Sequence, residues 1–408
     1  MENGPNLNRR GFFTATGGIS IAALLAACGG SSGSSSSSGG GGAASTAAAP
    51  AASTAAAKAT PPKFNPASEP GGALKVFEWA GYDDKHMWAN YIAGPYGSTS
   101  PLKFTFLEND QQALAKVASG VQYDLIHPCI AYWPDYKQAG LIQAYDPSLL
   151  PDYQGIPAAI RDPGVGPDGL IYHVPFDIGF STLTYRADKV NPKELSWNML
   201  QDARYKGRMS LFSDEVSIIK IGHLINVGKP VNPNVLTQDE INAAADTMKQ
   251  IAPNLRNFWG SETDTVNDFV NGNIDMTYTW PDGYWRIKTD PKMKGVPIEY
   301  LQPKEGRLAW VCGLVLGANT KQPGRATSAV AAANTPKTAA WLTDAYQYAS
   351  AQQNGVAALV QNKAIVTAFG LNDPSAFAPP KAWFEAPLPN RAAYVKAGQE
   401  VKASVGAS

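Results

Sequence analysis

The chain has 408 residues and carries 34 basic and 34 acidic side chains, so its formal net charge is zero. A chain of this length can bury a large core and can form two domains. Because the charges balance, the chain has no basic footprint for nucleic acid, and we expect no nucleic-acid partner.

The first 28 residues have the layout of a secretory signal. Arg9 and Arg10 precede a short apolar stretch over residues 19–27, and paired arginines are typical of the export route for folded proteins. Cys28 ends a Leu-Ala-Ala-Cys sequence that matches the bacterial lipobox, which predicts cleavage before Cys28 and a lipid on its sulfur. The alternative is an ordinary signal peptide with an incidental cysteine. We expect the protein at the periplasmic or extracellular face of a bacterial membrane, anchored through Cys28.

A low-complexity segment follows the signal. Residues 29–42 contain only glycine and serine, and residues 43–63 are mostly alanine with Ser, Thr, Pro and Lys. Such a segment cannot bury enough apolar area to offset the entropy of ordering it. We therefore predict a disordered tether over residues 29–70 and a globular body that begins near Gly71.

The first part of the body alternates strands with helices. Strands are predicted at 74–79, 102–107 and 123–126. The helices after them are expected to start at a cap formed by Asp83 or Asp84, at a cap formed by Asn109 or Asp110, and near Ala131. Successive strand–helix units predict a parallel sheet, in which ligands collect at the carboxyl ends of the strands. Trp79, Tyr82 and the loop 127–132 are expected at that edge.

The chain then repeats this organisation with different contents. Further strands are predicted at 171–185, 209–212, 274–280, 298–301 and 309–316. Helices are predicted to start at Ser196, to cover 266–270, and to cover 338–350. Asp214 follows the strand at 209–212, and the strand at 274–280 ends at Trp280.

Several short motifs in this body carry a family resemblance. In chain order they are Tyr123-Asp124-Leu125-Ile126, Ala139-Gly140-Leu141-Ile142-Gln143, Tyr172-His173-Val174-Pro175-Phe176, Tyr205-Lys206-Gly207-Arg208, Asn271-Gly272-Asn273-Ile274-Asp275, and Pro303-Lys304-Glu305-Gly306 before Trp310. Their order and spacing over most of residues 74–360 resemble those of extracellular solute-binding proteins of ABC importers. The class is similar to the bacterial spermidine/putrescine-binding proteins.

The resemblance implies an α/β fold of the periplasmic-binding-protein type II kind, with two lobes and a hinged cleft that closes on one small molecule. The lobes would be residues 71–177 plus 311–375, and residues 178–310 plus 376–408. The implied function is the substrate-binding component of an ABC importer, which captures a small amine-containing solute and delivers it to a membrane permease. A polyamine such as putrescine or spermidine is favoured. No cofactor and no enzymatic activity are implied, and a monomer is expected.

The resemblance also implies a set of ligand contacts. Family members that bind polyamines place aromatic rings against the methylene chain and carboxylates at the ammonium ends, which is physically favourable. The matching positions here are Trp79, Tyr82, Cys129, Tyr132, Asp214, Trp280, Trp310 and Cys312. For each tryptophan taken singly, packing in the core is the alternative role.

Three departures from the family pattern weaken the case for a diamine or triamine. Cys312 stands where the family has an acid, Ser217 replaces a second acid, and Cys129 replaces a serine. The acids that could substitute are Glu215, Asp177 and Asp282. We expect Cys129 and Cys312 to approach each other, and they would then either form a disulfide or remain two separate thiols.

Other function classes have less support in the sequence. No serine-hydrolase elbow, zinc-protease motif or phosphate loop favours a secreted enzyme. Adjacent tyrosines typical of ferric-ion binders do not occur, and no repeat suggests an adhesin. The four histidines are scattered without ligand spacing, so no metal site is expected: His86, His127, His173 and His223. The nearest alternative is a binding protein of the same fold for an opine, a betaine or an amino-acid derivative.

Overall fold

A computed structural model describes residues 58–405 of the chain. The predictions for the signal, for lipidated Cys28 and for most of the tether concern residues 1–57, which lie outside the described residues. Within residues 58–405, no helix is both long enough and apolar enough to cross a membrane.

The segment before the first strand lies against the body. The sequence assigns residues 58–70 to the tether, but Phe64 packs against the hydrophobic core. The Glu69 carboxylate accepts hydrogen bonds from the backbone N–H groups of Gly324 and Arg325 at 2.7 and 2.9 Å. These two residues begin helix α9 (Pro323–Ala333), where a negative charge stabilises the helix terminus. Glu69 in this segment therefore supplies the hydrogen-bond acceptors that the N–H groups at the start of α9 need.

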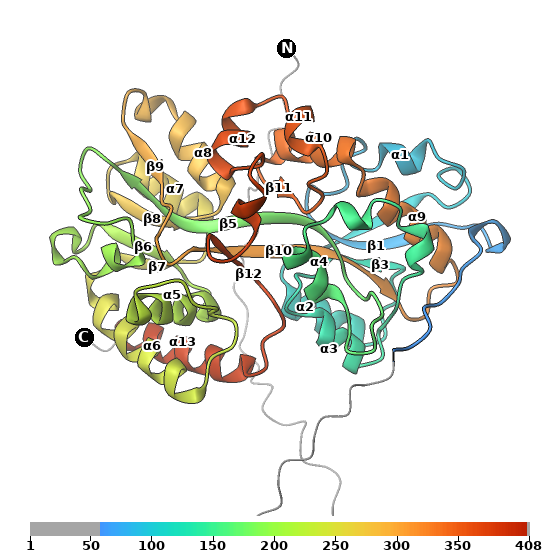
Figure 1. Ribbon diagram of the computed structural model, residues 1–408, viewed down its shortest axis with the longest axis horizontal. Helices are drawn as coiled ribbons and strands as arrows, with labels where there is room; N and C mark the ends of the chain where they lie inside the picture. The colour runs from blue at the N-terminus through green and yellow to red at the C-terminus, as the bar shows by residue number, and fades with distance from the viewer. Residues whose placement is uncertain (1–57, 406–408) are drawn as a thin grey trace, which may run out of the picture. The chain divides into compact units, whose positions relative to one another are not determined.

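Two sets of parallel strands are joined by two long strands that cross the middle of the body (Figure 1). The sheet order is β2-β1-β3-β10-β5-β8-β6-β7. The bounds are β1 (Leu74–Trp79), β2 (Leu102–Leu107), β3 (Leu125–Ile126), β5 (Val174–Arg186), β6 (Met209–Phe212), β7 (Asn257–Trp259), β8 (Met276–Thr279) and β10 (Arg307–Gly317). We refer to the part built on β1, β2 and β3 as the first lobe, and to the part built on β6, β7 and β8 as the second lobe. The predicted pair of α/β lobes joined by crossing strands is confirmed.

The crossing strands β5 and β10 are antiparallel to each other and to the lobe strands β8 and β3 that they contact. Four short strands also pair with them: β4 (Ile142–Gln143), β9 (Ile298–Tyr300), β11 (Ala349–Ser350) and β12 (Ala382–Phe384). The remaining α-helices are α1 (Ala89–Ile92), α2 (Asp110–Ala118), α3 (Trp133–Gln138), α4 (Ala158–Arg161), α5 (Glu215–Val227), α6 (Gln238–Ile251), α7 (Glu262–Val270), α8 (Pro281–Thr289), α10 (Pro336–Tyr346), α11 (Val356–Leu359), α12 (Lys363–Phe369) and α13 (Arg391–Val405).

Most predicted elements occur where the sequence places them, and the differences have local causes. β1, β2 and β6 have the predicted bounds, and Asn109 caps α2 by accepting from the Gln112 N–H at 2.9 Å. Asp84 caps no helix, because α1 begins only at Ala89 and the Asp84 carboxylate accepts from the His86 N–H instead. The helix predicted at 338–350 ends at Tyr346, since the residues of β11 pair with β5.

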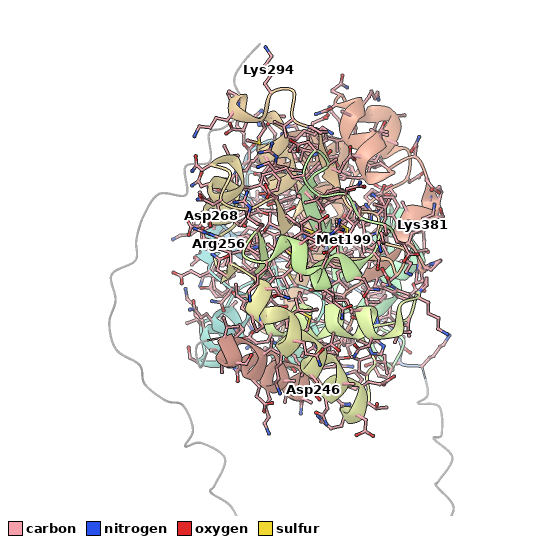
Figure 2. All side chains as sticks on the ribbon, turned by 90° about the vertical axis from the view of Figure 1, so that its left-hand side faces the viewer. Met199, Asp246, Arg256, Asp268, Lys294 and Lys381 are labelled. Atoms are coloured by element: carbon pink, nitrogen blue, oxygen red, sulfur yellow. A yellow bond between two sulfur atoms is a disulfide. The ribbon has the colours of Figure 1, made fainter. Side chains whose placement is uncertain are left out.

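The hydrophobic core forms two clusters. One cluster lies in the first lobe and extends to Trp285 on α8. In the other cluster, side chains of β6 and β8 pack against α5, α6 and α13. Figure 2 views the second lobe from outside, where Arg256 and Asp268 lie at the surface as an ion pair of 3.5 Å. Because such exposed pairs contribute little, burial of apolar side chains accounts for most of the favourable free energy of folding.

Candidate functional site

A small cavity lies beside the crossing strands, on the side of the second lobe. Its volume is about 10 Å³, which is room for about one water molecule. Its walls include Ser181 on β5, Lys220 on α5, Tyr278 on β8, Trp310 on β10, Trp383 on β12 and Glu385 after β12. The cavity thus combines aromatic rings with charged groups from five segments of the chain.

Trp310 reaches this cavity because its neighbour on β5 is a glycine. Trp310 and Gly179 are direct partners in the β5–β10 pairing, and a Cβ atom at Gly179 would lie only 2.3 Å from Cε2 of the indole. The ring of Tyr348 meets the indole edge-on at 5.3 Å. Among the described residues, the buried Nε1 of Trp310 has no hydrogen-bond partner. The structure therefore places the predicted Trp310 in a cavity wall with an unused donor.

Asp214 begins α5 at the edge of the same region. Its carboxylate accepts a hydrogen bond of 2.7 Å from the backbone N–H of Ser217, so the residue caps the helix. Ser217 itself lines the cavity, as does Tyr278. The position where the family has a second acid is thus occupied by an uncharged hydroxyl in the cavity wall.

Two charged wall residues, Lys220 and Glu385, were not among the predicted contacts. Lys220 is only 5% exposed, and within residues 58–405 no carboxylate lies within 4.0 Å of its Nζ. Burial lowers the pKa of Lys220, whereas the nearby carboxylates of Glu385 and Asp214 raise it. Burial raises the pKa of Glu385 to about 7, against the opposing effect of Lys220. These groups interact electrostatically without forming an ion pair.

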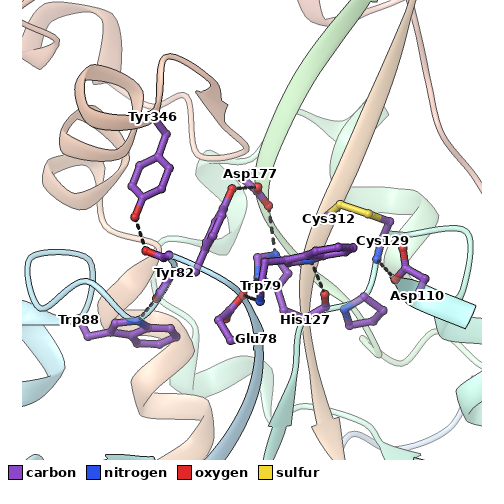
Figure 3. Close-up of polar contacts among 12 residues, drawn as sticks. Glu78, Trp79, Tyr82, Trp88, Asp110, His127, Cys129, Asp177, Cys312 and Tyr346 are labelled. Carbon is purple, nitrogen blue, oxygen red and sulfur yellow. Dashed lines mark hydrogen bonds and ion pairs between the residues drawn. A yellow bond between two sulfur atoms is a disulfide. The ribbon is translucent and has the colours of Figure 1, made fainter. Parts of the chain in front are cut away.

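The first lobe holds a buried acid–histidine cluster, which we define as Glu78, Tyr82, His127 and Asp177 (Figure 3). His127 lies between the carboxylates of Glu78 and Asp177, with Nε2 at 3.1 Å from Asp177 Oδ1. Burial lowers the pKa of His127, but the two carboxylates outweigh burial and raise it to about 10. His127 is therefore a positively charged core residue.

Tyr82, a predicted ligand contact, belongs to this cluster. Its hydroxyl donates to Asp177, and only 6% of the residue is exposed. Trp79 lies next to the cluster, with its indole N–H donating to the carbonyl of His127 at 2.9 Å (Figure 3). The hydrogen-bonding groups of both predicted aromatic residues are thus occupied within the first lobe.

Cys129 and Cys312 are joined by a disulfide, so the prediction that they approach each other is confirmed (Figure 3). The bond links the loop after β3 to the crossing strand β10. The backbone N–H of Cys129 also donates to the Asp110 carboxylate at 2.8 Å, and burial raises the pKa of Asp110 to about 6. The disulfide cannot supply the carboxylate that the family has at the position of Cys312.

Tyr132 lies where a helix of each lobe meets the other. It begins α3, and the Arg391 guanidinium at the start of α13 lies 3.6 Å from the centre of its ring. Arg391 also pairs with Asp135 on α3 at 2.9 Å. Because α3 packs in the first core and α13 in the second, this contact connects the lobes.

Trp280 follows β8, as predicted, but is not among the walls of the cavity. Its ring meets Phe212 and Trp259 edge-on at 5.1 and 5.5 Å, and its backbone N–H donates to Glu262 at 3.0 Å. Of the predicted contacts, only Trp310 lies in the cavity wall, with Asp214 close by.

The three acids that could replace the missing family carboxylates all interact with other side chains. Asp177 belongs to the buried acid–histidine cluster, Glu215 pairs with Lys402 at 2.6 Å, and Asp282 interacts with Glu262. Lys220 could have been found from its context, since it is the only charged residue within the apolar run Ile218–Ile225 of α5. The Trp383-Phe384-Glu385 sequence likewise combines the two side-chain types expected for an amine site.

The sequence of the chain is similar to those of several curated binding proteins. The spermidine/putrescine-binding periplasmic protein of Escherichia coli K12 is 26% identical over 205 residues, which cover 49% of this chain and 55% of that protein. The chain therefore matches about half the length of the first curated relatives.

Solved structures share the fold. The Tp0655 (TpPotD) lipoprotein of Treponema pallidum aligns with a TM-score of 0.67 at 16% identity, over 81% of this chain and 99% of that one. The spermidine/putrescine ABC transporter substrate-binding protein PotD of Streptococcus pneumoniae gives 0.65 at 14% identity, over 82% and 99%. The predicted type II binding-protein fold is confirmed. The model of the family described as bacterial extracellular solute-binding protein matches residues 104–369, a span that includes both crossing strands and strands of each lobe, and the chain belongs to this family.

Proposed function

We propose that the protein is the solute-binding component of an ABC importer and that its cleft captures a small amine-bearing solute for a membrane permease. The observation that supports this best is the small cavity beside the crossing strands, whose walls include Trp310, Trp383 and Glu385. An aromatic face attracts an alkylammonium group, and a desolvated carboxylate gives it a charge-assisted hydrogen bond.

Closure of the two lobes on the solute is part of this proposal. The lobes would comprise residues 71–177 plus 311–375, and residues 178–310 plus 376–408, as the sequence suggests. The walls of the cavity come from the second of these lobes, so we expect the first lobe to close over a solute held there, in an arrangement that a permease would recognise. The signal and Cys28 would hold the protein at the outer face of a bacterial membrane.

The names of the relatives favour a polyamine, whereas the residues of this chain support only the broader class of organic amines. The family acids are replaced by Cys312, which is bonded to Cys129, and by Ser217, which is uncharged. An opine, a betaine or an amino-acid derivative is therefore the alternative within the same proposal.

A thermal-unfolding screen tests the amine proposal. The exported protein is heated with putrescine, spermidine, glycine betaine, amino acids or opines, and with neutral sugars and dicarboxylates as controls. A ligand of the folded state raises the midpoint in a saturable manner, by about 2.7 kcal/mol of stability at 100 times its Kd. A response to sugars or dicarboxylates alone would contradict the proposal.

The Trp310→Ala variant tests whether the ligand that raises the thermal midpoint binds in the cavity. We expect this substitution to abolish or strongly reduce the midpoint shift, because it removes a wall. Trp341→Ala is the matched control, since Trp341 lies on α10 against His86 and outside the cavity walls. An unchanged ligand response in Trp310→Ala would remove the cavity as the binding site.

A further inference from the structure

The first-lobe ends of the crossing strands are attached to that lobe by additional segments (Figure 1). Asp177 and Ile178 of β5 pair with β11, and Cys312 of β10 is bonded to Cys129 in the loop after β3. Just before β11, the hydroxyl of Tyr346 donates to a carbonyl in the loop after β1. We therefore expect this part of the crossing strands to move with the first lobe.

The other ends are attached to the second lobe in the same way. Leu308 and Ala309 of β10 pair with β12, and Thr182 of β5 pairs with β8. β12 is itself held by the second lobe, because the side-chain amide of Asn234, which precedes α6, donates to the Phe384 carbonyl at 2.9 Å. We therefore expect this part of the crossing strands to move with the second lobe.

A single pair of residues lies between the two attached parts. Gly179 of β5 and Trp310 of β10 are direct partners, and within residues 58–405 neither pairs with a third strand. A change in the angle between the lobes needs backbone rotation at a point that no other strand holds. Glycine allows such rotation with the least steric restriction. The pairing pattern therefore indicates one place where the crossing strands can bend.

The indole of Trp310 lies across this pair. A Cβ atom at Gly179 would lie 2.3 Å from Cε2 of the ring and 2.4 Å from Cζ2 and Nε1, which is closer than side-chain carbons approach other atoms. The same ring lines the cavity together with Ser181 and Leu308, which belong to the part attached to the second lobe. Rotation at Gly179 would therefore move one wall of the cavity relative to the others.

We propose that the Gly179–Trp310 pair is the pivot of lobe closure, and that Gly179 is the positioning residue that keeps the indole in the cavity wall as the lobes turn. This inference rests on the lobe closure in the proposed function, but not on the identity of the solute. A solute that packs on Trp310 favours the lobe angle at which the ring fits it, so binding and closure are coupled through one residue.

Distances between spin labels on the two lobes test the pivot without any solute. The labels are attached to cysteines introduced at Lys103 and Lys206, which are exposed positions on β2 and shortly before β6, and pulsed electron resonance is recorded on the exported protein. Gly179→Ala should shift the mean distance, because its methyl group displaces the indole. The same substitution in a Trp310→Ala background should cause no shift, because the collision is gone.

Two controls separate the pivot from general loosening of the fold. Gly324→Ala also introduces a collision, 2.8 Å from the Glu69 carboxylate, but within the first lobe, so the mean distance should not shift. Trp310→Ala alone should broaden the distribution of distances, because the pivot loses the ring that covers it, whereas Trp341→Ala should leave the distribution as in the parent. This comparison tests the pivot even where Gly179→Ala does not fold.

Unchanged distances in both Gly179→Ala and Trp310→Ala would overturn the pivot. An equal shift from Gly179→Ala with and without the indole would also overturn it, since Gly179 would then act independently of Trp310. Because no solute is present, these results are independent of the thermal screen. Loss of the pivot would leave amine binding intact, and failure of every amine to bind would leave the pivot intact.

Discussion

Asp214 combines two roles whose effects can be separated by substitution. Its carboxylate caps α5 and also acts electrostatically on the cavity. Asp214→Asn keeps an excellent cap and removes the charge, so we expect an unchanged thermal midpoint and an affinity for the amine weaker by about 1–3 kcal/mol. Asp214→Ala should show the same loss of affinity and a further loss of about 1 kcal/mol in stability. Parent-like affinity in both variants would exclude a contact with the amine.

The buried acid–histidine cluster makes stability depend on pH. Because the pKa of His127 is about 10 when folded and about 6.5 when unfolded, its stabilising protonation is complete below pH 6.5 and is lost as pH rises toward 10. We expect the free energy of unfolding, measured by urea denaturation, to decline over that range.

A neutral cluster is the control for this dependence. The triple variant Glu78→Gln, His127→Gln, Asp177→Asn keeps hydrogen-bonding groups and removes the three charges, so its stability should vary less between pH 6.5 and 10. A parent whose stability is constant or rises over this range would contradict a charged His127.

At the residue scale, strand ends and motifs are only a partial guide to the cavity, since Trp280 follows β8 but is not among the cavity walls. Trp310 and Asp214 follow from motif and strand position, and both lie at or beside the cavity. Glu385 could not be predicted, because it reaches the cavity only through the pairing of β12 with β10, a contact between distant segments. Lys220 was overlooked although its apolar helix marks it as buried.

At the scale of elements, α3 and α13 hold the lobes together through Arg391. Its ion pair with Asp135 is partly exposed and its ring contact with Tyr132 is close, so together we expect a contribution of about 1 kcal/mol to the closed arrangement. Arg391→Ala should therefore raise the Kd of the solute roughly fivefold, mainly through faster dissociation in stopped-flow measurements.

A surface arginine provides the comparison. Arg186 pairs with Asp188 at 2.7 Å within one lobe, so Arg186→Ala should leave the dissociation rate unchanged. Equal rates for Arg391→Ala and the parent would show that this contact does not stabilise the bound state.

Element boundaries were predictable where the pattern is local. β1, β2 and β6 are apolar runs between clear turn residues, and their bounds agree with the prediction. β11 was missed because its two residues have no strand pattern of their own and become a strand only by pairing with β5. Short elements of this kind are fixed by tertiary contact.

For the whole molecule, the disulfide is a long-range constraint. Cys129 and Cys312 are 183 residues apart, so their bond restricts the unfolded chain strongly. We expect Cys129→Ser with Cys312→Ser to lower the free energy of unfolding by about 2–5 kcal/mol, measured by denaturation without reductant. The parent measured with reductant should lose the same amount, and equal stability of all three samples would show that the bond contributes nothing.

The fold as a whole was predictable because strand–helix alternation and the family motifs extend over most of the body. The cavity's chemistry was less predictable, since its walls combine residues from five segments that no local pattern connects. The order of the motifs is sufficient to predict the topology. The positions of the charged groups in the cavity cannot be predicted in this way, because they depend on which side chains the five segments bring together.

The course of the chain around the cavity also sets when that cavity can exist during synthesis. Along the chain, its walls begin with Ser181 on β5 and end with Glu385, which follows β12. Both sets of lobe strands are translated before β12 emerges. A nascent chain can therefore form both sets of lobe strands before it holds every wall of this cavity.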